Sequence, residues 1–262
     1  MASVIPTIPG VNFAHPDVRK IEVRDLRDAL AKGLDDFRAM PTFAIFLAAI
    51  YPVVGLILMR LSFGYDMLPL VFPLIAGFPL IGPLAAIGLY ELSRRREQGL
   101  GVSWDALNDI HFSCIRGIVI LGTALLAMFF AWLCVALLVY RATFGDWVPP
   151  SIGEFALQIS TTPPGWTLVV VGCGVGFLFA VVAFTISVVS FPMLLDRDVE
   201  VGVAVLTSVR AVRASPATMV LWGTFVVGSL LIGMLPFFFG LAVVLPVLGH
   251  STWHLYRKIV QP

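Results

Sequence analysis

Of the 262 residues of this chain, 59% are hydrophobic and only 13% carry a charge, whereas about a quarter of the residues of a soluble domain are charged. This balance and a mean hydropathy of +0.96 predict that most of the chain lies in lipid. The formal net charge of +1 excludes the extended basic field of a nucleic-acid-binding protein. The three cysteines have no paired spacing, which excludes a disulfide framework and a cysteine-based zinc site.

The N-terminal part divides into a tail and a first helix. Residues 1–17 have no hydrophobic period and no signal-peptide core, which predicts a disordered tail before a single integral membrane domain at 18–262. From Val18 to Met40, apolar side chains recur every three or four residues and charged ones fill the opposite face, so we predict an amphipathic helix on the membrane surface. Its apolar stripe consists of Val23, Leu26, Leu30, Leu34 and Phe37.

Apolar runs of membrane-spanning length follow this helix. We predict an all-α polytopic membrane bundle of six transmembrane helices, at residues 43–60, 68–92, 118–140, 167–192, 219–239 and 240–256. Two further cytoplasmic amphipathic helices are expected, one from Trp104 to Cys114 and one through Arg210 and Arg213 to Pro216. The loop from Arg141 to Trp166 contains a short candidate helix at Ile152–Ile159.

The basic residues predict the orientation of this bundle. In the six-span arrangement all of them except Arg60 and Arg141 lie on one side of the membrane. Because basic residues are retained in the cytoplasm during insertion, both termini are expected there, in a multi-pass protein of the cell inner membrane.

A weak internal repeat is also visible. Ala29 to Pro41 aligns with Ala204 to Pro216, and Asp105-Ala106-Leu107 begins a middle copy. The segment from Gly82 to Arg94 likewise parallels that from Leu245 to Arg257. Each copy would hold one surface helix and two spans, and three parallel copies predict a pseudo-threefold axis along the membrane normal.

Two basic clusters end the second and sixth spans. They consist of Arg94, Arg95 and Arg96, and of Arg257 and Lys258. Such clusters contact anionic lipid headgroups, but orienting the helices is the simpler interpretation and the one we favour. Glu91 lies just inside the apolar boundary, where a carboxylate needs a partner, and Arg94 one turn away is the expected one.

His250 and His254 are the metal-ligand candidates. Four residues apart, they share one helix face, a spacing that suits a metal or a haem. His111, Glu91 and Asp196 could complete such a site. The interpretation that we favour is structural: both histidines hydrogen-bond at the ends of neighbouring spans, with Glu91 as a candidate partner. The sequence contains no nucleophile with a base, phosphate loop or paired catalytic carboxylates, so we predict no catalytic residues, no cofactor and no enzymatic activity.

Several motifs point to a known family. They are Gly82-Pro83, the run from Gly88 to Glu97, Phe191-Pro192 with Asp196-Arg197-Asp198, and the run from Gly249 to Arg257. From about Arg19 to its C-terminus, the chain resembles the bacterial integral membrane proteins known as domain of unknown function 2189. The resemblance implies a multi-spanning protein of the inner membrane with no established activity.

The functional prediction is therefore a non-enzymatic membrane component that packs with lipids or with a membrane protein complex. The glycine spacing at Gly172 and Gly176 favours such packing. One alternative is a small-molecule or lipid transporter, because prolines in the predicted spans leave backbone carbonyls free. The other is a haem- or metal-binding membrane subunit that uses His250 and His254. Membrane lipids are the expected partners, and nucleic acid is not.

Overall fold

The computed structural model describes residues 16–41, 53, 60, 68–77, 80, 82–101, 112–236 and 239–261. Over these ranges the regular structure is helical, with one isolated bridge between Val18 and Val260. The helices are α1 (Val23–Ala39), α4 (Leu68–Gly77), α5 (Gly82–Ala85), α6 (Ile87–Glu97), α7 (Phe112–Phe144), α8 (Ile152–Thr161), α9 (Pro163–Ser187), α10 (Ser190–Asp196), α11 (Val201–Ala214), α12 (Pro216–Met234) and α13 (Leu241–Ile259).

Three described segments are long and apolar enough to cross a membrane. They are Cys114–Phe144 in α7, Pro163–Asp196 in α9 and α10, and Pro216–Met234 in α12. These segments agree with the predicted spans at 118–140, 167–192 and 219–239. Helix α7 has 33 residues, a length of about 50 Å at 1.5 Å per residue, so it extends beyond a hydrocarbon core of about 30 Å.

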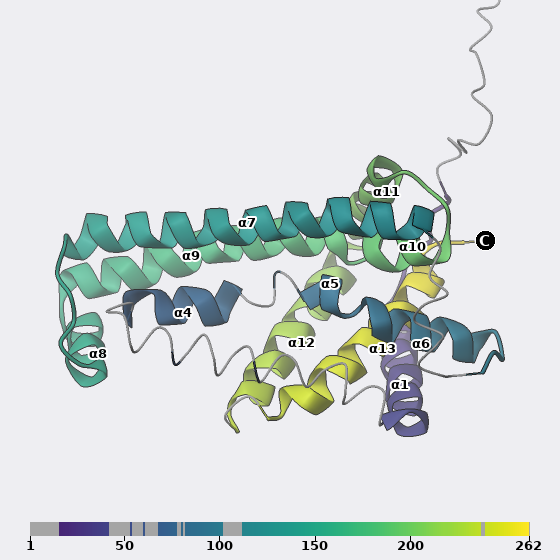
Figure 1. Ribbon diagram of the computed structural model, residues 1–262, viewed down its shortest axis with the longest axis horizontal. Coiled ribbons are helices and arrows are strands. Elements are labelled where there is room, and N and C mark those ends of the chain that lie inside the picture. Colours follow the sequence, from purple (N-terminus) through teal and green to yellow (C-terminus); the bar gives the residue numbers. More distant parts are fainter. Residues whose placement is uncertain are drawn as a thin grey trace, which may run out of the picture.

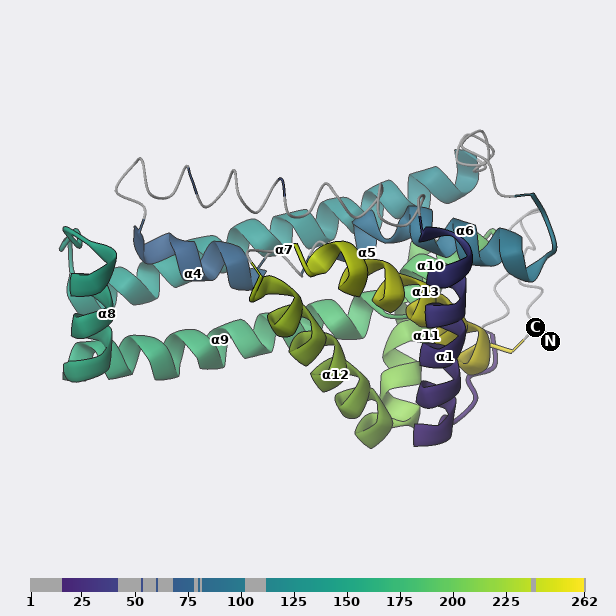
Figure 2. The same cartoon turned by 90° about the horizontal axis from the view of Figure 1, so that it is seen from below.

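Helices α7 and α9 lie side by side and form the longest part of the molecule (Figure 1). They are joined at their far end by the segment that contains α8, which covers the helix predicted at Ile152–Ile159 and runs transverse to both of them in Figure 2. Local signals define these elements. The Ser151 hydroxyl accepts from the Glu154 N–H at the start of α8, and the Thr162 hydroxyl accepts from the Gly165 N–H at the start of α9.

The second predicted span, 68–92, is not one continuous helix. The chain forms α4, the single turn α5 and then α6 over this range, and the range is not among the candidate spans of the described residues. Pro73 lies within α4 and Pro83 at the start of α5, where ring closure removes a backbone donor. The Trp132 indole of α7 donates to the Pro73 carbonyl at 2.9 Å, so a side chain from a neighbouring helix fixes the end of α4.

The remaining span predictions have different outcomes. Helix α13 covers the predicted span 240–256 as one helix with Pro246 inside it. The predicted span 43–60 lies outside the described residues except for Val53 and Arg60, and so does the predicted surface helix from Trp104 to Cys114 as far as His111. The structure thus contains three candidate spans of the six that we predicted.

Helix α1 forms where the first surface helix was predicted, and its buried face shares only Leu26 with the predicted apolar stripe. Leu26, Ala29, Gly33 and Asp36 point into the molecule, whereas Val23 and Leu34 of the predicted apolar stripe are 46% and 37% exposed. The buried side chains are mostly small because α1 packs closely across α13 (Figure 2).

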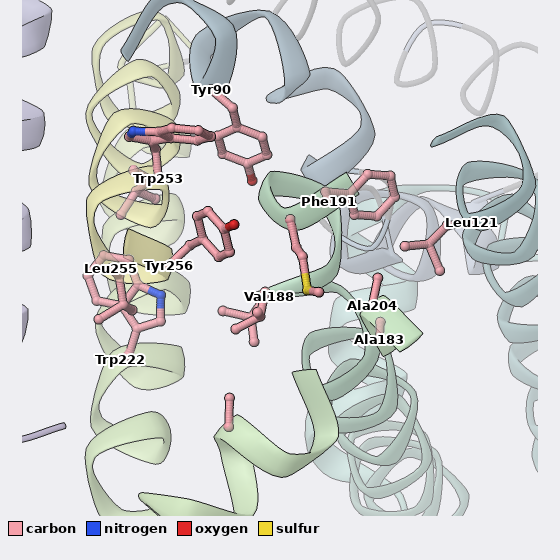
Figure 3. Packing of buried hydrophobic residues seen from close by; sticks show 14 of the residues in the cluster. Tyr90, Leu121, Ala183, Val188, Phe191, Ala204, Trp222, Trp253, Leu255 and Tyr256 are labelled. Atoms are coloured by element: carbon pink, nitrogen blue, oxygen red, sulfur yellow. The ribbon is translucent and has the colours of Figure 1, made fainter. Parts of the chain in front are cut away.

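The core lies where α6, α10, α12 and α13 meet. Figure 3 shows Trp253 beside Tyr90, with Tyr256, Leu255 and Trp222 facing Phe191 and Val188 of the α9–α10 corner. Trp222, Trp253, Tyr256 and Phe191 are among the largest fully buried side chains. Aromatic side chains of this size contribute much of the apolar area removed from solvent.

The two ends of the described chain are held together. The Arg19 N–H donates to the Ile259 carbonyl at 2.8 Å, and the Gln261 N–H donates to the Asp17 carbonyl at 3.2 Å. The Ile21 N–H also donates to the Ser215 hydroxyl, at the junction of α11 and α12. The segment before α1 and the end of α13 therefore lie at the same end of the bundle.

Candidate functional site

The most concentrated polar cluster lies where α1, α6 and α13 meet. At its centre is Asp36 of α1, which is only 2% exposed. Its carboxylate accepts hydrogen bonds from Ser93 at 2.5 Å, from His254 at 2.8 Å and from Arg96 at 2.5 Å. We call these four residues and His250 the Asp36 cluster.

The charge of Asp36 is stabilised despite burial. Burial by itself raises the pKa of a carboxyl group, but the hydrogen bonds from His254, Ser93 and Arg96 outweigh it and lower the pKa of Asp36 to about 2. The charged form of Arg96 is stabilised as well, because its hydrogen bonds to Asp36 and Asp35 raise the pKa of its guanidinium group. The cluster is thus a charge-assisted connection between helices that are distant in sequence.

His250 forms the innermost part of the cluster. Its side chain is fully buried, and its Nδ1 atom lies 2.7 Å from the Ser93 hydroxyl. Because the single Ser93 proton is donated to Asp36, the His250 Nδ1 atom must supply the proton in this contact. The Nε2 atom then carries a lone pair, and it has no hydrogen-bond partner among the described residues.

Glu91 of α6 makes a second, separate ion-pair group. It is fully buried, and its carboxylate accepts from Arg94 at 2.7 and 2.9 Å and from Arg95 at 3.0 Å. The two arginines follow Glu91 on the same helix by three and four residues, the spacing at which helical side chains meet. His250 contacts Ser93 and His254 contacts Asp36, so neither histidine bonds Glu91, the partner that we expected.

A third group connects α13 with α6 and α10. Asp196 accepts from the Tyr256 hydroxyl at 2.7 Å and from Arg257 at 3.2 Å. Glu97 accepts from the Trp253 indole at 3.0 Å and pairs with Arg257 at 3.3 Å. Arg257 therefore bridges the ends of two helices that come from different parts of the sequence.

The residues predicted as lipid or topology contacts all have internal partners. Arg94 and Arg95 pair with Glu91, Arg96 with Asp35 and Asp36, and Arg257 with Glu97 and Asp196. Lys258 pairs with Asp28 at 2.7 Å and with Asp25 at 3.7 Å. Arg96, Arg257 and Lys258 join helices at one end of the bundle, whereas Arg94 and Arg95 pair within α6. The role of these cations as lipid contacts stays a prediction.

The metal-ligand candidates come together with a carboxylate, but not with those proposed for them. Asp36 lies 2.8 Å from His254 Nε2 and 4.0 Å from His250 Nδ1, whereas Asp196 is engaged by Tyr256 and Arg257, and His111 lies outside the described residues. Among the described residues, no group of three histidine, cysteine or carboxylate side chains has an arrangement that could hold a metal ion.

Sequence reasoning missed Asp36 as the centre of this cluster. A signal was present, because Asp36 falls seven residues after Ala29 and three after Gly33, on the face of small side chains that lets another helix approach. An acid on such a face must find a partner in the neighbouring helix.

Comparisons with known proteins relate part of the chain to a protein family. No curated protein and no solved structure matches it. The family match includes the resemblance motifs from Gly82 to Glu97 and from Phe191 to Asp196, but not the run from Gly249 to Arg257. Residues 71–196 match the model described as "Predicted integral membrane protein (DUF2189)", so this part of the chain is similar to that family of predicted integral membrane proteins.

Proposed function

We propose that this protein is a non-enzymatic component of the cell inner membrane that packs with lipids or with a membrane protein complex. The observation that carries the proposal is the exposed surface of α9. Only 6% of the most apolar part of Pro163–Asp196 is buried within the molecule. An apolar surface of this length requires lipid or another membrane chain around it.

The carboxylates support the same function, because their hydrogen-bond partners belong to the chain itself. Asp36, Glu91 and Asp196 each accept from more than one side chain of the chain itself. Asp36 and Asp196 use their bonding capacity to connect helices, and Glu91 uses its own within α6, which favours a structural role at the membrane over a reaction centre.

The orientation forms part of the proposal. The two ends of the described chain and the basic residues of α6 and α13 lie at one end of the bundle. Tyr140, Phe144 and Trp147 stack at the far end beside α8, as aromatic residues do at a membrane interface. We infer that the end with both termini faces the cytoplasm.

A threefold internal repeat is also proposed. In the alignment of Ala29–Pro41 with Ala204–Pro216, four pairs of aligned positions are buried in both helices, namely Ala29 with Ala204, Gly33 with Ser208, Asp36 with Ala211 and Met40 with Ser215. Equal burial at aligned positions supports a common ancestry of α1 and α11. Residues 102–111, which begin the middle copy, lie outside the described residues.

Site-specific photo-crosslinking in native membranes tests the main proposal. A photoreactive phenylalanine analogue at Phe177, which is 67% exposed, should react with lipid or with another membrane protein. The same analogue at Leu121, which is 3% exposed, should react only within the chain. Crosslinks from Phe177 to soluble proteins, or extraction of the chain from membranes by alkaline carbonate, would contradict the proposal.

A second candidate function is transport of a small molecule or lipid. It is favoured by the interruption of residues 68–92 between α4 and α6 and by Pro246 within α13, because broken helices provide backbone carbonyls for a solute. Flux into proteoliposomes measures it directly, with Pro246→Ala as the test variant. Solute-specific uptake that this variant abolishes would favour transport over the packing role.

The haem- or metal-binding alternative has its own test. The lone pair of His250 Nε2 is the only feature of the Asp36 cluster that favours a ligand in the described structure. Metal analysis and an absorption spectrum of the purified protein should be compared with the His250→Ala, His254→Ala double variant. A stoichiometric metal or a Soret band that the double variant loses would establish this alternative.

A further inference from the structure

We propose that the outer faces of α1 and α11 bind the anionic headgroups of the membrane leaflet. The inference rests on the proposed membrane role and specifies the lipid that the protein recognises. We call the exposed residues Val23, Arg27, Leu34 and Arg38 of α1 and Leu206, Arg210 and Arg213 of α11 the basic surface.

The charge of α1 argues for an anionic partner. All four aspartates of this helix are used within the molecule: Asp25 pairs with Arg19, Asp28 with Lys32 and Lys258, and Asp35 and Asp36 with Arg96. Arg27 and Arg38 are exposed and make no ion pair within the described part of the chain. The helix therefore presents uncompensated positive charge, although its sequence holds similar numbers of acids and bases.

The position of apolar side chains beside these arginines argues for a lipid partner. Val23, Arg27 and Leu34 lie on one face of the helix, and Leu30 on the same face is partly buried against the core. This face lies beside the buried face of α1, which includes Ala29, Gly33 and Asp36. Val23 and Leu34 are 46% and 37% exposed. A helix with apolar residues and arginines on its free side is suited to the boundary between headgroups and acyl chains.

Helix α11 repeats this arrangement. Its inner face is anchored by Ser208, whose hydroxyl donates to the Thr185 carbonyl at 2.7 Å and accepts from the Val189 N–H at 3.2 Å. On its outer face Leu206 is 40% exposed, and Arg210 and Arg213 are exposed without an ion pair among the described residues. Arg213 aligns with Arg38 in the internal repeat, three residues before a proline in both copies.

The orientation of the two helices fits a membrane surface. Both run across the direction of α7 and α9 at the end of the molecule that holds the two chain ends (Figures 1 and 2). If α7 and α9 cross the bilayer, α1 and α11 lie along its surface. Four arginines there would meet the phosphates of an anionic leaflet, and each such residue adds to the attraction.

Lipid retention by the purified full-length protein tests the inference. The protein in neutral detergent is titrated with phosphatidylglycerol or with phosphatidylcholine, and bound lipids are counted by native mass spectrometry. We expect preferential binding of phosphatidylglycerol. The Arg38→Gln, Arg213→Gln variant should weaken that binding by about tenfold, with phosphatidylcholine binding unchanged.

A matched control separates the basic surface from net charge. The Lys32→Gln, Arg141→Gln variant also removes two cations, one paired with Asp28 on α1 and one at the far end of α7, and it should bind phosphatidylglycerol like the unmodified protein. Equal weakening in both variants, or in neither, would overturn the inference. Unchanged lipid binding together with intact membrane crosslinks from Phe177 would overturn it while leaving the proposed function in place.

Discussion

Gly33 of α1 lies directly against the backbone of Ser251 in α13. A Cβ atom added to Gly33 would be 2.6 Å from the Ser251 nitrogen and 2.8 Å from its Cα atom. These atoms belong to the main chain of a helix and cannot move aside alone. The absence of a side chain at residue 33 therefore determines how closely the two helices cross, and it positions Asp36 one turn later beside His254 and Ser93.

The Gly33→Ala substitution should separate α1 from α13. We expect a loss of about 1–3 kcal/mol in the free energy of unfolding, the usual effect of overpacking. Gly202→Ala in α11 is the control, because a Cβ atom there meets no atom within 4 Å, and alanine favours the helix. Thermal unfolding of the purified variants in detergent measures both. Equal midpoints for the two variants would show that the crossing is looser than described.

Asp36→Asn should destabilise the protein more than Asp35→Asn does. Both carboxylates pair with Arg96, but the Asp35 side chain is 67% exposed and the Asp36 side chain 3%. Hydrogen bonds to a charged group contribute about 1.5–3 kcal/mol each, so we expect a loss of about 2–3 kcal/mol for Asp36→Asn. An exposed pair contributes at most about 1 kcal/mol. Denaturant unfolding distinguishes the two, and similar losses would mean that Asp36 is not buried.

The contribution of Asp36 should depend on pH. Its pKa is lowered to about 2 in the folded protein, against about 3.9 in an unfolded chain. A lowered pKa means that the unfolded state takes up the proton first, so the stabilisation is complete above about pH 5 and is lost as the pH falls from 4 towards 2. The difference in stability between the unmodified protein and Asp36→Asn should therefore be constant near neutral pH and shrink below pH 4. A constant difference down to pH 2 would exclude this assignment.

Two glycines of α9 should differ in their tolerance of substitution. A Cβ atom on Gly176 would lie 2.9 Å from the Trp132 ring, whereas one on Gly172 meets no atom within 4 Å. Gly176→Ala should lower the free energy of unfolding by about 1 kcal/mol or more, because the buried indole has little room to move. Gly172→Ala should have no such effect. The reverse order would indicate that Gly172 forms a closer helix contact than Gly176.

Cysteine labelling tests the orientation. In a protein whose three native cysteines are replaced by alanine, Ser151→Cys at the α8 end should react with a membrane-impermeant maleimide in intact cells. Gln98→Cys, exposed after the arginine cluster of α6, should react only after the membrane is permeabilised. Labelling of Gln98→Cys alone in intact cells would reverse the proposed topology.

Much of the helical architecture could be predicted because its signals are local. Pro163 and Pro216 occupy the first turns of α9 and α12, where proline is well tolerated, and long apolar runs follow both. The interruption of residues 68–92 was harder to predict. The prolines were visible, but a proline within a membrane helix is often compensated by a neighbour, and here the Trp132 indole, 59 residues further on, bonds the Pro73 carbonyl.

The Asp36 cluster depended on contacts that no local pattern contains. His254 and Asp36 are 218 residues apart in the sequence, and depth in the membrane alone favoured Glu91 as the histidine partner. Glu91 was unsuitable because Arg94 and Arg95 of its own helix already occupy it. The face of α1 that packs on α13 was hidden for a similar reason, because Ala29, Gly33 and Asp36 are small or acidic and form no apolar stripe in the sequence.

The pairing of residues 17–19 with residues 259–261 has a consequence for synthesis. Because Asp36 precedes its partner His254 by 218 residues, α1 leaves the ribosome long before α13, the helix on which it packs. Until α13 has been made, Gly33 and Asp36 lack Ser251 and His254, so α1 can reach its final position only after those residues emerge. A copy whose synthesis stops before α13 would therefore leave α1 without the helix on which it docks.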